Sequence, residues 1–119
     1  GRVQVLGFVG AGELKFLMQN ARMFFFPSLY EGFGMPNIEA MAFGVPVVTS
    51  PAFAVSGVVK DGALVVDPTN YVELAKALTA VSVDGETRSL LIKRGLVVAK
   101  MYSWDESARI TIDVYKSIA

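Results

Sequence analysis

Residues 27–48 carry the sequence PSLYEGFGMPNIEAMAFGVPVV, in which turn residues separate short apolar segments. An apolar run at 23–26, a methionine and three phenylalanines, precedes this stretch, and a run rich in β-branched residues at 45–49 closes it. Pro36 stands at the start of an apolar helical segment and Gly44 directly follows it, which is the asymmetry expected of helix ends. The stretch therefore predicts a strand, a glycine-rich loop, a short helix over 36–43 and a second strand.

The predicted strands share a nearly continuous apolar composition: they are residues 3–9, 23–26, 45–49 and 63–66. Strands that are buried on both faces of a parallel sheet have this composition, whereas half-exposed strands alternate. Helical segments separate several of these runs, as in α/β proteins. The 119 residues are therefore predicted to form a single α/β domain, a Rossmann-like parallel sheet of about four strands with helices on both faces.

Helix starts are marked by capping residues. A short helix is predicted over 13–21, and Asn70 and Asp84 each precede a longer one. The last helix begins at Ser103, which is predicted to form a capping box with Glu106. The apolar residues of this helix fill one broad arc, so we expect it to pack as an outer layer anchored by its tryptophan.

Two smaller features concern packing. Gly95 lies inside the helix that follows Asp84, where a glycine costs about 1 kcal/mol relative to alanine. Three consecutive aromatic residues, 24–26, suggest base stacking at first sight, but in a strand such a run more often belongs to the core. We therefore assign these three phenylalanines to the core.

The composition excludes several kinds of chemistry. The chain has no cysteine and no histidine, which removes disulfides, thiolate nucleophiles, imidazole metal ligands and Ser-His-Asp triads. Its eleven basic and eleven acidic residues give a net charge of zero, so nucleic acid is not an expected partner. No apolar run approaches the ~20 residues that span a bilayer, and no signal-peptide pattern opens the sequence. We expect a cytoplasmic protein with no membrane span.

The glycine-rich loop is the candidate site. Open α/β sheets bind ligands at loops that leave the carboxyl ends of their strands. Gly32 and Gly34 allow the backbone to approach a ligand closely, and the helix that follows directs its positive end at the same place. A phosphate is the most natural ligand for this arrangement.

Two glutamates flank this loop. Glu31 and Glu39 carry carboxylates suited to accept hydrogen bonds from sugar hydroxyls on either side of a phosphate. This predicts a sugar, a diphosphate and a ribose in a row. A simpler interpretation stays open, because an acid near a helix start is stabilised by the helix dipole and glycines often serve only turns.

The segment 26–48 resembles the signature of the family 4 retaining glycosyltransferases (glycosyl transferases group 1), which have the GT-B fold. The pair Glu31 and Glu39, with seven residues between, is the hallmark of that family. The resemblance extends over nearly the whole chain, from 6–9 through 64–68 to 102–104. It implies a donor site for a nucleotide-diphosphate sugar, retention of configuration and no catalytic metal.

The resemblance also implies residue roles. Glu31 would be the catalytic residue, bonding the donor sugar's hydroxyls and helping to orient it. Backbone at 32–34 would line the sugar and phosphates, the helix start at 35–36 would meet the diphosphate, and Glu39 would hold the ribose hydroxyls. The implied ligand-binding residues are thus Gly32, Phe33, Gly34, Met35, Pro36 and Glu39.

The chain also departs from the family pattern. It corresponds to the later part of the C-terminal lobe and lacks that lobe's first two strands, with their basic pair, and the N-terminal lobe. None of Lys15, Arg22 and Lys60 matches the basic pair. We therefore expect no activity from this chain alone, and association with the missing N-terminal lobe or with a second copy, most simply as a homo-oligomer.

Two alternatives remain open. The chain could be a non-catalytic interaction module or an engineered scaffold that keeps only the fold. It could also be a nicotinamide-binding domain, because a glycine-rich turn at 7–12 follows a predicted strand and opens a helix. The spacing of that turn is Gly-x-x-Gly-x-Gly, however, which differs from the dinucleotide-binding fingerprint.

Overall fold

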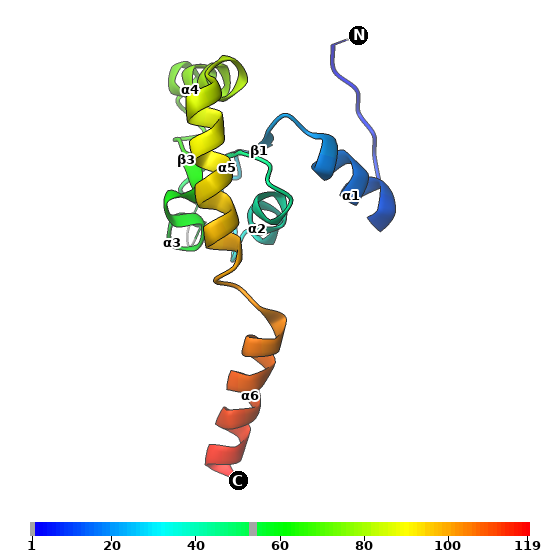
Figure 1. Ribbon diagram of the computed structural model, residues 1–119, viewed down its shortest axis with the longest axis vertical. Helices are drawn as coiled ribbons and strands as arrows, with labels where there is room; N and C mark the ends of the chain where they lie inside the picture. The colour runs from blue at the N-terminus through cyan, green and yellow to red at the C-terminus, as the bar shows by residue number, and fades with distance from the viewer. Residues whose placement is uncertain (1, 53–54) are drawn as a thin grey trace.

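The computed structural model describes residues 2–52 and 55–119. Within these residues, a three-stranded parallel sheet has the order β1 (Phe24–Phe26), β2 (Val47–Thr49) and β3 (Ala63–Val65). Both pairs of neighbouring strands run parallel, and the middle residue of β2, Val48, lies between Phe25 and Leu64. The predicted α/β class and parallel sheet are confirmed (Figure 1).

The helices surround this sheet and continue beyond it. Their bounds are α1 Ala11–Asn20, α2 Met35–Ala42, α3 Val55–Val59 with the 3-10 turn η1 Lys60–Gly62, α4 Tyr71–Val83, α5 Gly85–Ala99 and α6 Trp104–Ile118. The helices predicted from the sequence are all present, with ends that differ by a residue or two. No helix in the described part of the chain has the length and apolar character needed to cross a membrane.

The predicted caps form at three helix starts. The side chains of Asn70, Asp84 and Ser103 accept hydrogen bonds from backbone amides in the first turns of α4, α5 and α6. At α6 the reciprocal half of the predicted capping box is replaced, because both oxygens of Glu106 accept hydrogen bonds from Arg109. The side chain that would complete the box therefore forms an ion pair instead.

The core has two parts, one on each face of the sheet. Val47 packs with residues of α2, α3 and the end of α5, while Val48 packs with residues of α4 and the middle of α5. This alternation follows from the strand geometry, in which successive side chains point to opposite faces. The prediction of helices on both faces is confirmed.

The segment 3–9 does not form the strand that its composition predicts. Residues 2–10, all of them described, contain no strand, and the Phe8 side chain is 98% exposed. In Figure 1 this segment runs away from the sheet. A strand requires a neighbour to bond its amides and carbonyls, and the apolar pattern alone does not supply one. The prediction was therefore wrong for this segment.

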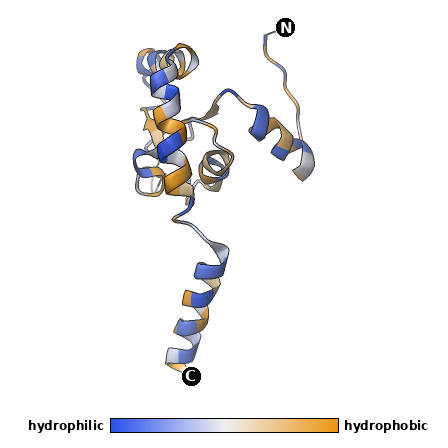
Figure 2. Cartoon of the chain, in the orientation of Figure 1, coloured by the Kyte–Doolittle hydropathy of each residue, from blue (hydrophilic) through white to orange (hydrophobic). Residues whose placement is uncertain are grey.

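Helix α6 does not pack as an outer layer. None of its residues, which the structure describes in full, is buried, and the Trp104 side chain is 78% exposed. The helix extends away from the rest of the molecule, and it displays apolar and polar residues to solvent (Figure 2). The predicted apolar arc is real, but the described chain offers no surface that covers it. Trp104 accordingly does not act as a packing anchor.

The three phenylalanines of β1 are only partly in the core. Phe24 and Phe26 are half-buried and their rings stack with centroids 5.6 Å apart. The Phe25 side chain is 39% exposed. The core prediction fails for Phe25 because β1 is an edge strand of this sheet.

Candidate functional site

The glycine-rich loop connects the carboxyl end of β1 to the start of α2. Gly34, the N-cap residue of α2, has φ +77° and ψ +42°, which is a left-handed conformation. A Cβ atom on Gly34 would lie 3.0 Å from Nδ2 of Asn37 and 3.1 Å from Cγ2 of Val55. Both the backbone conformation and the lack of space therefore require glycine at this position. The loop enters the helix without a side-chain cap.

The Glu31 carboxylate is held within this loop. It is half-buried, and its Oε1 accepts a hydrogen bond of 3.1 Å from the hydroxyl of Ser28. The hydroxyl of Ser50 donates to the carbonyl oxygen of Ser28, and that of Thr49 donates to the carbonyl oxygen of Phe26 at 2.9 Å. Hydroxyls from the end of β2 thus fix the backbone at Phe26 and Ser28, in the segment that leads to Glu31.

An aromatic contact joins the same loop to the segment between α5 and α6. The rings of Phe33 and Tyr102 meet edge to face, with centroids 5.4 Å apart and an interplanar angle of 90°. The hydroxyl of Tyr102 donates to the carbonyl oxygen of Val58 at 2.9 Å. Phe33 is therefore supported by a ring that is itself fixed to α3.

A groove of about 630 Å³ lies between α2 and the start of α6. Its volume falls within the range of about 300–1,000 Å³ that is usual for small-molecule sites. Three of the predicted site residues line it, namely Phe33, Met35 and Glu39, whereas Glu31 does not. The other lining residues are Ile38, Ala42, Ala99, Met101, Tyr102, Ser103, Trp104, Glu106, Ser107 and Ile110.

The two predicted glutamates have different surroundings. Glu31 is half-buried and bonded to Ser28, whereas Glu39 is exposed on α2 beside the groove. Of the other predicted residues, Gly34 is buried, Met35 and Pro36 are half-buried, and Gly32 and Phe33 are exposed. The structure thus places six of the seven in one loop and helix start and Glu39 in the second turn of α2, and their functional roles stay predictions.

Sequence reasoning missed four residues that shape this site. Ser28 lies two residues after the end of β1 and Ser50 directly follows β2, and hydroxyls at strand ends were the available signal. Tyr102 gave no local signal. Asn37 is fully buried beneath Gly34, and within residues 2–52 and 55–119 its side-chain amide has no hydrogen-bond partner. The signal for that position was an amide in a helix that is apolar apart from Asn37 and Glu39.

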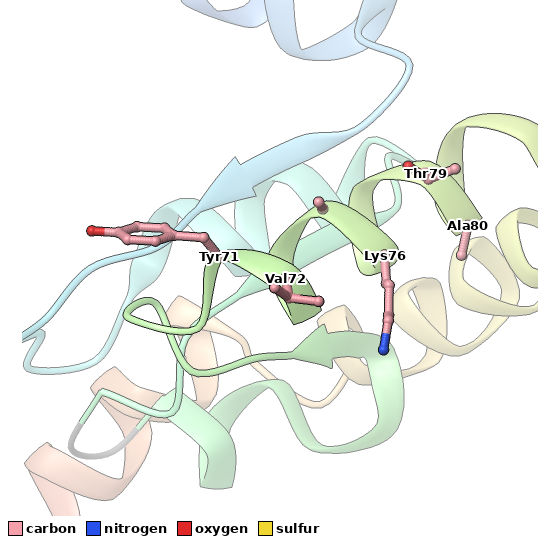
Figure 3. A pocket seen from close by; sticks show the side chains of 6 residues that line it. Tyr71, Val72, Lys76, Thr79 and Ala80 are labelled. Atoms are coloured by element: carbon pink, nitrogen blue, oxygen red, sulfur yellow. The ribbon is translucent and has the colours of Figure 1, made fainter.

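A second hollow, of about 700 Å³, lies on one face of α4 (Figure 3). Its lining comes from a single helix: Tyr71, Val72, Ala75, Lys76, Thr79 and Ala80. The Lys76 ammonium forms an ion pair with Glu73 at 2.9 Å. None of the predicted site residues contributes to this hollow, and its walls offer no convergent polar groups. We therefore place the candidate site at the loop before α2.

The glycine-rich turn at 7–12 lacks the setting of a dinucleotide site. Gly10 is the N-cap residue of α1, and its backbone amide donates to Oε2 of Glu13 at 3.0 Å. The fingerprint requires a strand before the turn and a helix start open to a phosphate. Here no strand precedes the turn among the described residues 2–6, and a carboxylate occupies the helix start.

Two of the cations that do not match the family's basic pair have structural contacts. The guanidinium of Arg22 donates to the carbonyl oxygen of Ser82, with a distance of 3.1 Å from Nε. The ammonium of Lys60 lies 3.2 Å from the sulfur of Met101. Neither contact involves the loop before α2.

The fold and the loop define a class of protein. The structure is similar to that of sucrose-phosphate synthase from Thermosynechococcus elongatus, with a TM-score of 0.88 and 28% sequence identity. The match covers 98% of this chain and 30% of that one. This is the GT-B glycosyltransferase class, as the resemblance in the sequence implied.

The family follows from the sequence match. Residues 1–97 match the family described as Glycosyl transferases group 1, and the chain belongs to that family. It is 40% identical over 116 residues to O-antigen chain mannosyltransferase B of Escherichia coli, covering 98% of this chain and 30% of that protein.

A second relative is also a mannosyltransferase. The chain is 39% identical over 112 residues to MMP alpha-(1->4)-mannosyltransferase of Mycolicibacterium hassiacum. The match covers 90% of this chain and 27% of that protein. The chain therefore spans about 30% of the length of these two curated relatives.

Proposed function

We propose that this chain is part of the donor-binding lobe of a family 4 retaining glycosyltransferase, and that it binds a nucleotide-diphosphate sugar. The observation that carries the proposal is the position of Glu31. Its carboxylate is held in the loop that follows β1, three residues before the left-handed Gly34 that caps the start of α2. A sugar-binding acid next to a helix start suits a ligand that joins a sugar to phosphates.

The proposed roles follow the order of residues along the loop. Glu31 accepts hydrogen bonds from donor-sugar hydroxyls and acts as the catalytic residue. Backbone at Gly32, Phe33 and Gly34 lines the sugar and phosphates. The helix start at 35–36 stabilises the leaving diphosphate electrostatically, which requires no metal ion. Glu39 holds the ribose hydroxyls.

The names of the relatives suggest which sugar to test first. Two of them are mannosyltransferases, so mannose is our first choice for the donor sugar. The chain spans about 30% of such relatives, and we propose that it transfers no sugar without the missing N-terminal lobe or a second copy. The cytoplasm is the proposed compartment.

An interaction module that keeps only the fold is the second candidate. The exposed apolar residues of α6 and of segment 3–9 favour it, because such surfaces suit a partner protein better than solvent. A family fold by itself does not prove the family's activity. The two candidates differ in whether the loop before α2 binds a donor.

Ligand-observed NMR separates the two candidates. The chain is mixed with GDP-mannose, UDP-glucose and ADP-glucose in turn, and the panel is repeated on Glu39→Ala. We expect one donor to bind wild type and to bind the variant more weakly. Glu86→Ala is the matched control, because Glu86 is an exposed first-turn glutamate on α5, away from the loop. A folded chain that binds none of the donors would favour the interaction module.

A further inference from the structure

We infer that Ser28 is a positioning residue, which orients the Glu31 carboxylate toward the sugar of the donor. This inference rests on the proposed function, because it assumes that Glu31 accepts hydrogen bonds from that sugar. The basis is the hydrogen bond of 3.1 Å from Ser28 Oγ to Glu31 Oε1. Ser28 would act on the sugar through Glu31 and not by contact of its own.

The bond restricts a side chain that would otherwise move. A glutamate has several rotamers, and fixing one of them when a ligand binds costs conformational entropy. Ser28 and Glu31 are both half-buried, so their hydrogen bond is partly shielded from water. A carboxylate that is held before the donor arrives binds it with a smaller entropic loss.

The position of Ser28 is itself set by the sheet. Its carbonyl oxygen accepts a hydrogen bond from the hydroxyl of Ser50, a buried residue that is 1% exposed. Two residues earlier, the carbonyl oxygen of Phe26 accepts from Thr49 Oγ1 at 2.9 Å. The backbone that carries Ser28 is thus fixed twice to the buried end of β2.

The geometry also predicts which part of a donor depends on Ser28. Ser28 occupies Oε1 of Glu31, and no residue among 2–52 and 55–119 donates to Oε2. A carboxylate oxygen has two lone pairs, so Oε2 is available to a sugar hydroxyl. Loss of Ser28 should therefore weaken recognition of the sugar and leave recognition of the nucleotide unchanged.

Calorimetric titration of the 119-residue chain measures this difference directly. Dissociation constants are determined for GDP-mannose and GDP, and for the matching UDP-glucose and ADP-glucose pairs. The affinity gained from the sugar is the ratio of the two constants in a pair. We expect Ser28→Ala to lower this ratio about fivefold to tenfold, the size of one ordinary intramolecular hydrogen bond, with the affinity for the free nucleotide unchanged.

Three variants accompany this measurement. Ser28→Thr keeps the hydroxyl and should retain most of the ratio. Ser89→Ala removes an exposed serine of α5 and should change nothing. Ser50→Ala leaves both Ser28 and Glu31 in place but frees the Ser28 carbonyl, so it should lower the ratio less than Ser28→Ala does. It also tests the inference if Ser28→Ala does not fold, as judged from its amide NMR spectrum.

The outcomes separate the inference from the proposed function. If Glu31→Ala lowers the ratio and neither Ser28→Ala nor Ser50→Ala does, the inference is overturned and the proposed function stands. An equal loss for nucleotide and nucleotide sugar would show a merely structural role for Ser28, which also overturns it. If wild type binds no probe, or Glu31→Ala has no effect, the proposed function fails and the inference fails with it.

Discussion

A Cβ atom on Gly62 would lie 3.1 Å from the Cα atom of Gly95, so α5 crosses the turn η1 with one glycine against another. A Cβ atom on Gly95 would in turn lie 3.1 Å from Cγ of Met41 in α2. The sequence pattern indicates only that Gly95 lowers the stability of its helix. The crossing shows its benefit, because α5 approaches α2 and η1 more closely than a larger residue would allow.

Gly95→Ala should therefore destabilise the protein, although alanine is the better helix former. Alanine gains about 1 kcal/mol in helix propensity, while overpacking a core costs about 1–3 kcal/mol. We expect a net loss of about 1 kcal/mol in the free energy of unfolding, measured by urea denaturation. Gly57→Ala on α3 is the control, because a Cβ atom there meets nothing within 4 Å and should be neutral or stabilising. Equal effects of the two variants on the free energy of unfolding would contradict the close packing of α5 against η1 and α2.

Gly34→Ala should destabilise the loop before α2. A left-handed conformation costs a non-glycine residue about 1–2 kcal/mol, and the new Cβ atom also clashes with Asn37 and Val55. We expect a loss of at least about 2 kcal/mol in the free energy of unfolding, measured by urea denaturation. A Gly34→Ala variant as stable as wild type would show that the loop adopts another conformation.

Gly32→Ala, in the same loop, should leave the stability of the protein nearly unchanged and weaken donor binding. Gly32 is exposed and a Cβ atom there meets nothing within 4 Å, so the unfolding free energy should change by less than about 0.5 kcal/mol. If the backbone at Gly32 lines the donor as proposed, the added methyl group should weaken donor binding in NMR titrations. Unchanged binding would remove Gly32 from the proposed site.

Acid should destabilise the start of α5 through Asp84. The hydroxyl of Thr87 and the backbone amides of Glu86 and Thr87 bond the Asp84 carboxylate, and they lower its pKa below the ordinary value of 3.8. The folded state therefore binds this proton less readily than the unfolded state. The stabilisation is complete above the ordinary pKa and is lost as the pH falls through the lowered one.

Thermal unfolding as a function of pH tests this prediction. Asp84→Asn keeps an oxygen that caps α5 but cannot titrate. Its melting temperature should fall less than that of wild type as the pH is lowered from neutral to about 3. Part of the decrease should remain, because hydrogen bonds from Thr69 to Asp67 and from Arg109 to Glu106 also lower the pKa of those carboxyl groups. Parallel curves for the two proteins would contradict the role of Asp84.

The exposed apolar residues of α6 should drive the association proposed above. We expect wild type to self-associate at high concentration in analytical ultracentrifugation. Val114→Glu places a charge on the apolar arc and should raise the dissociation constant at least about tenfold, because burying an unpaired carboxylate is unfavourable. Lys116→Glu changes a charge on the polar side of the helix and should have little effect. A strictly monomeric wild type would contradict the prediction.

The elements that sequence reasoning predicted correctly depend on neighbours along the chain. Asn70, Asp84 and Ser103 cap helices through amides two or three residues away, and such bonds are visible in a short stretch of sequence. The glycine-rich loop before α2 was likewise predicted, because Gly32, Gly34 and Pro36 are local signals.

The errors concern contacts between distant residues. Segment 3–9 has the composition of a buried strand but no neighbouring strand, and α6 has an apolar arc but no surface beneath it. Phe25 was assigned to the core because the sequence does not reveal that β1 is an edge strand. Hydropathy reports which residues favour burial, and it does not report whether anything covers them.

The sequence alone determined the α/β class, the helix starts and the family, because short-range hydrogen bonds and a motif of a few residues carry that information. The environment of Glu31 was settled by tertiary structure. Ser50, 22 residues from Ser28 in the chain, holds the loop from which Ser28 reaches Glu31. No local pattern predicts the hydrogen bond from Ser50 to Ser28, because it forms only where two parallel strands end side by side.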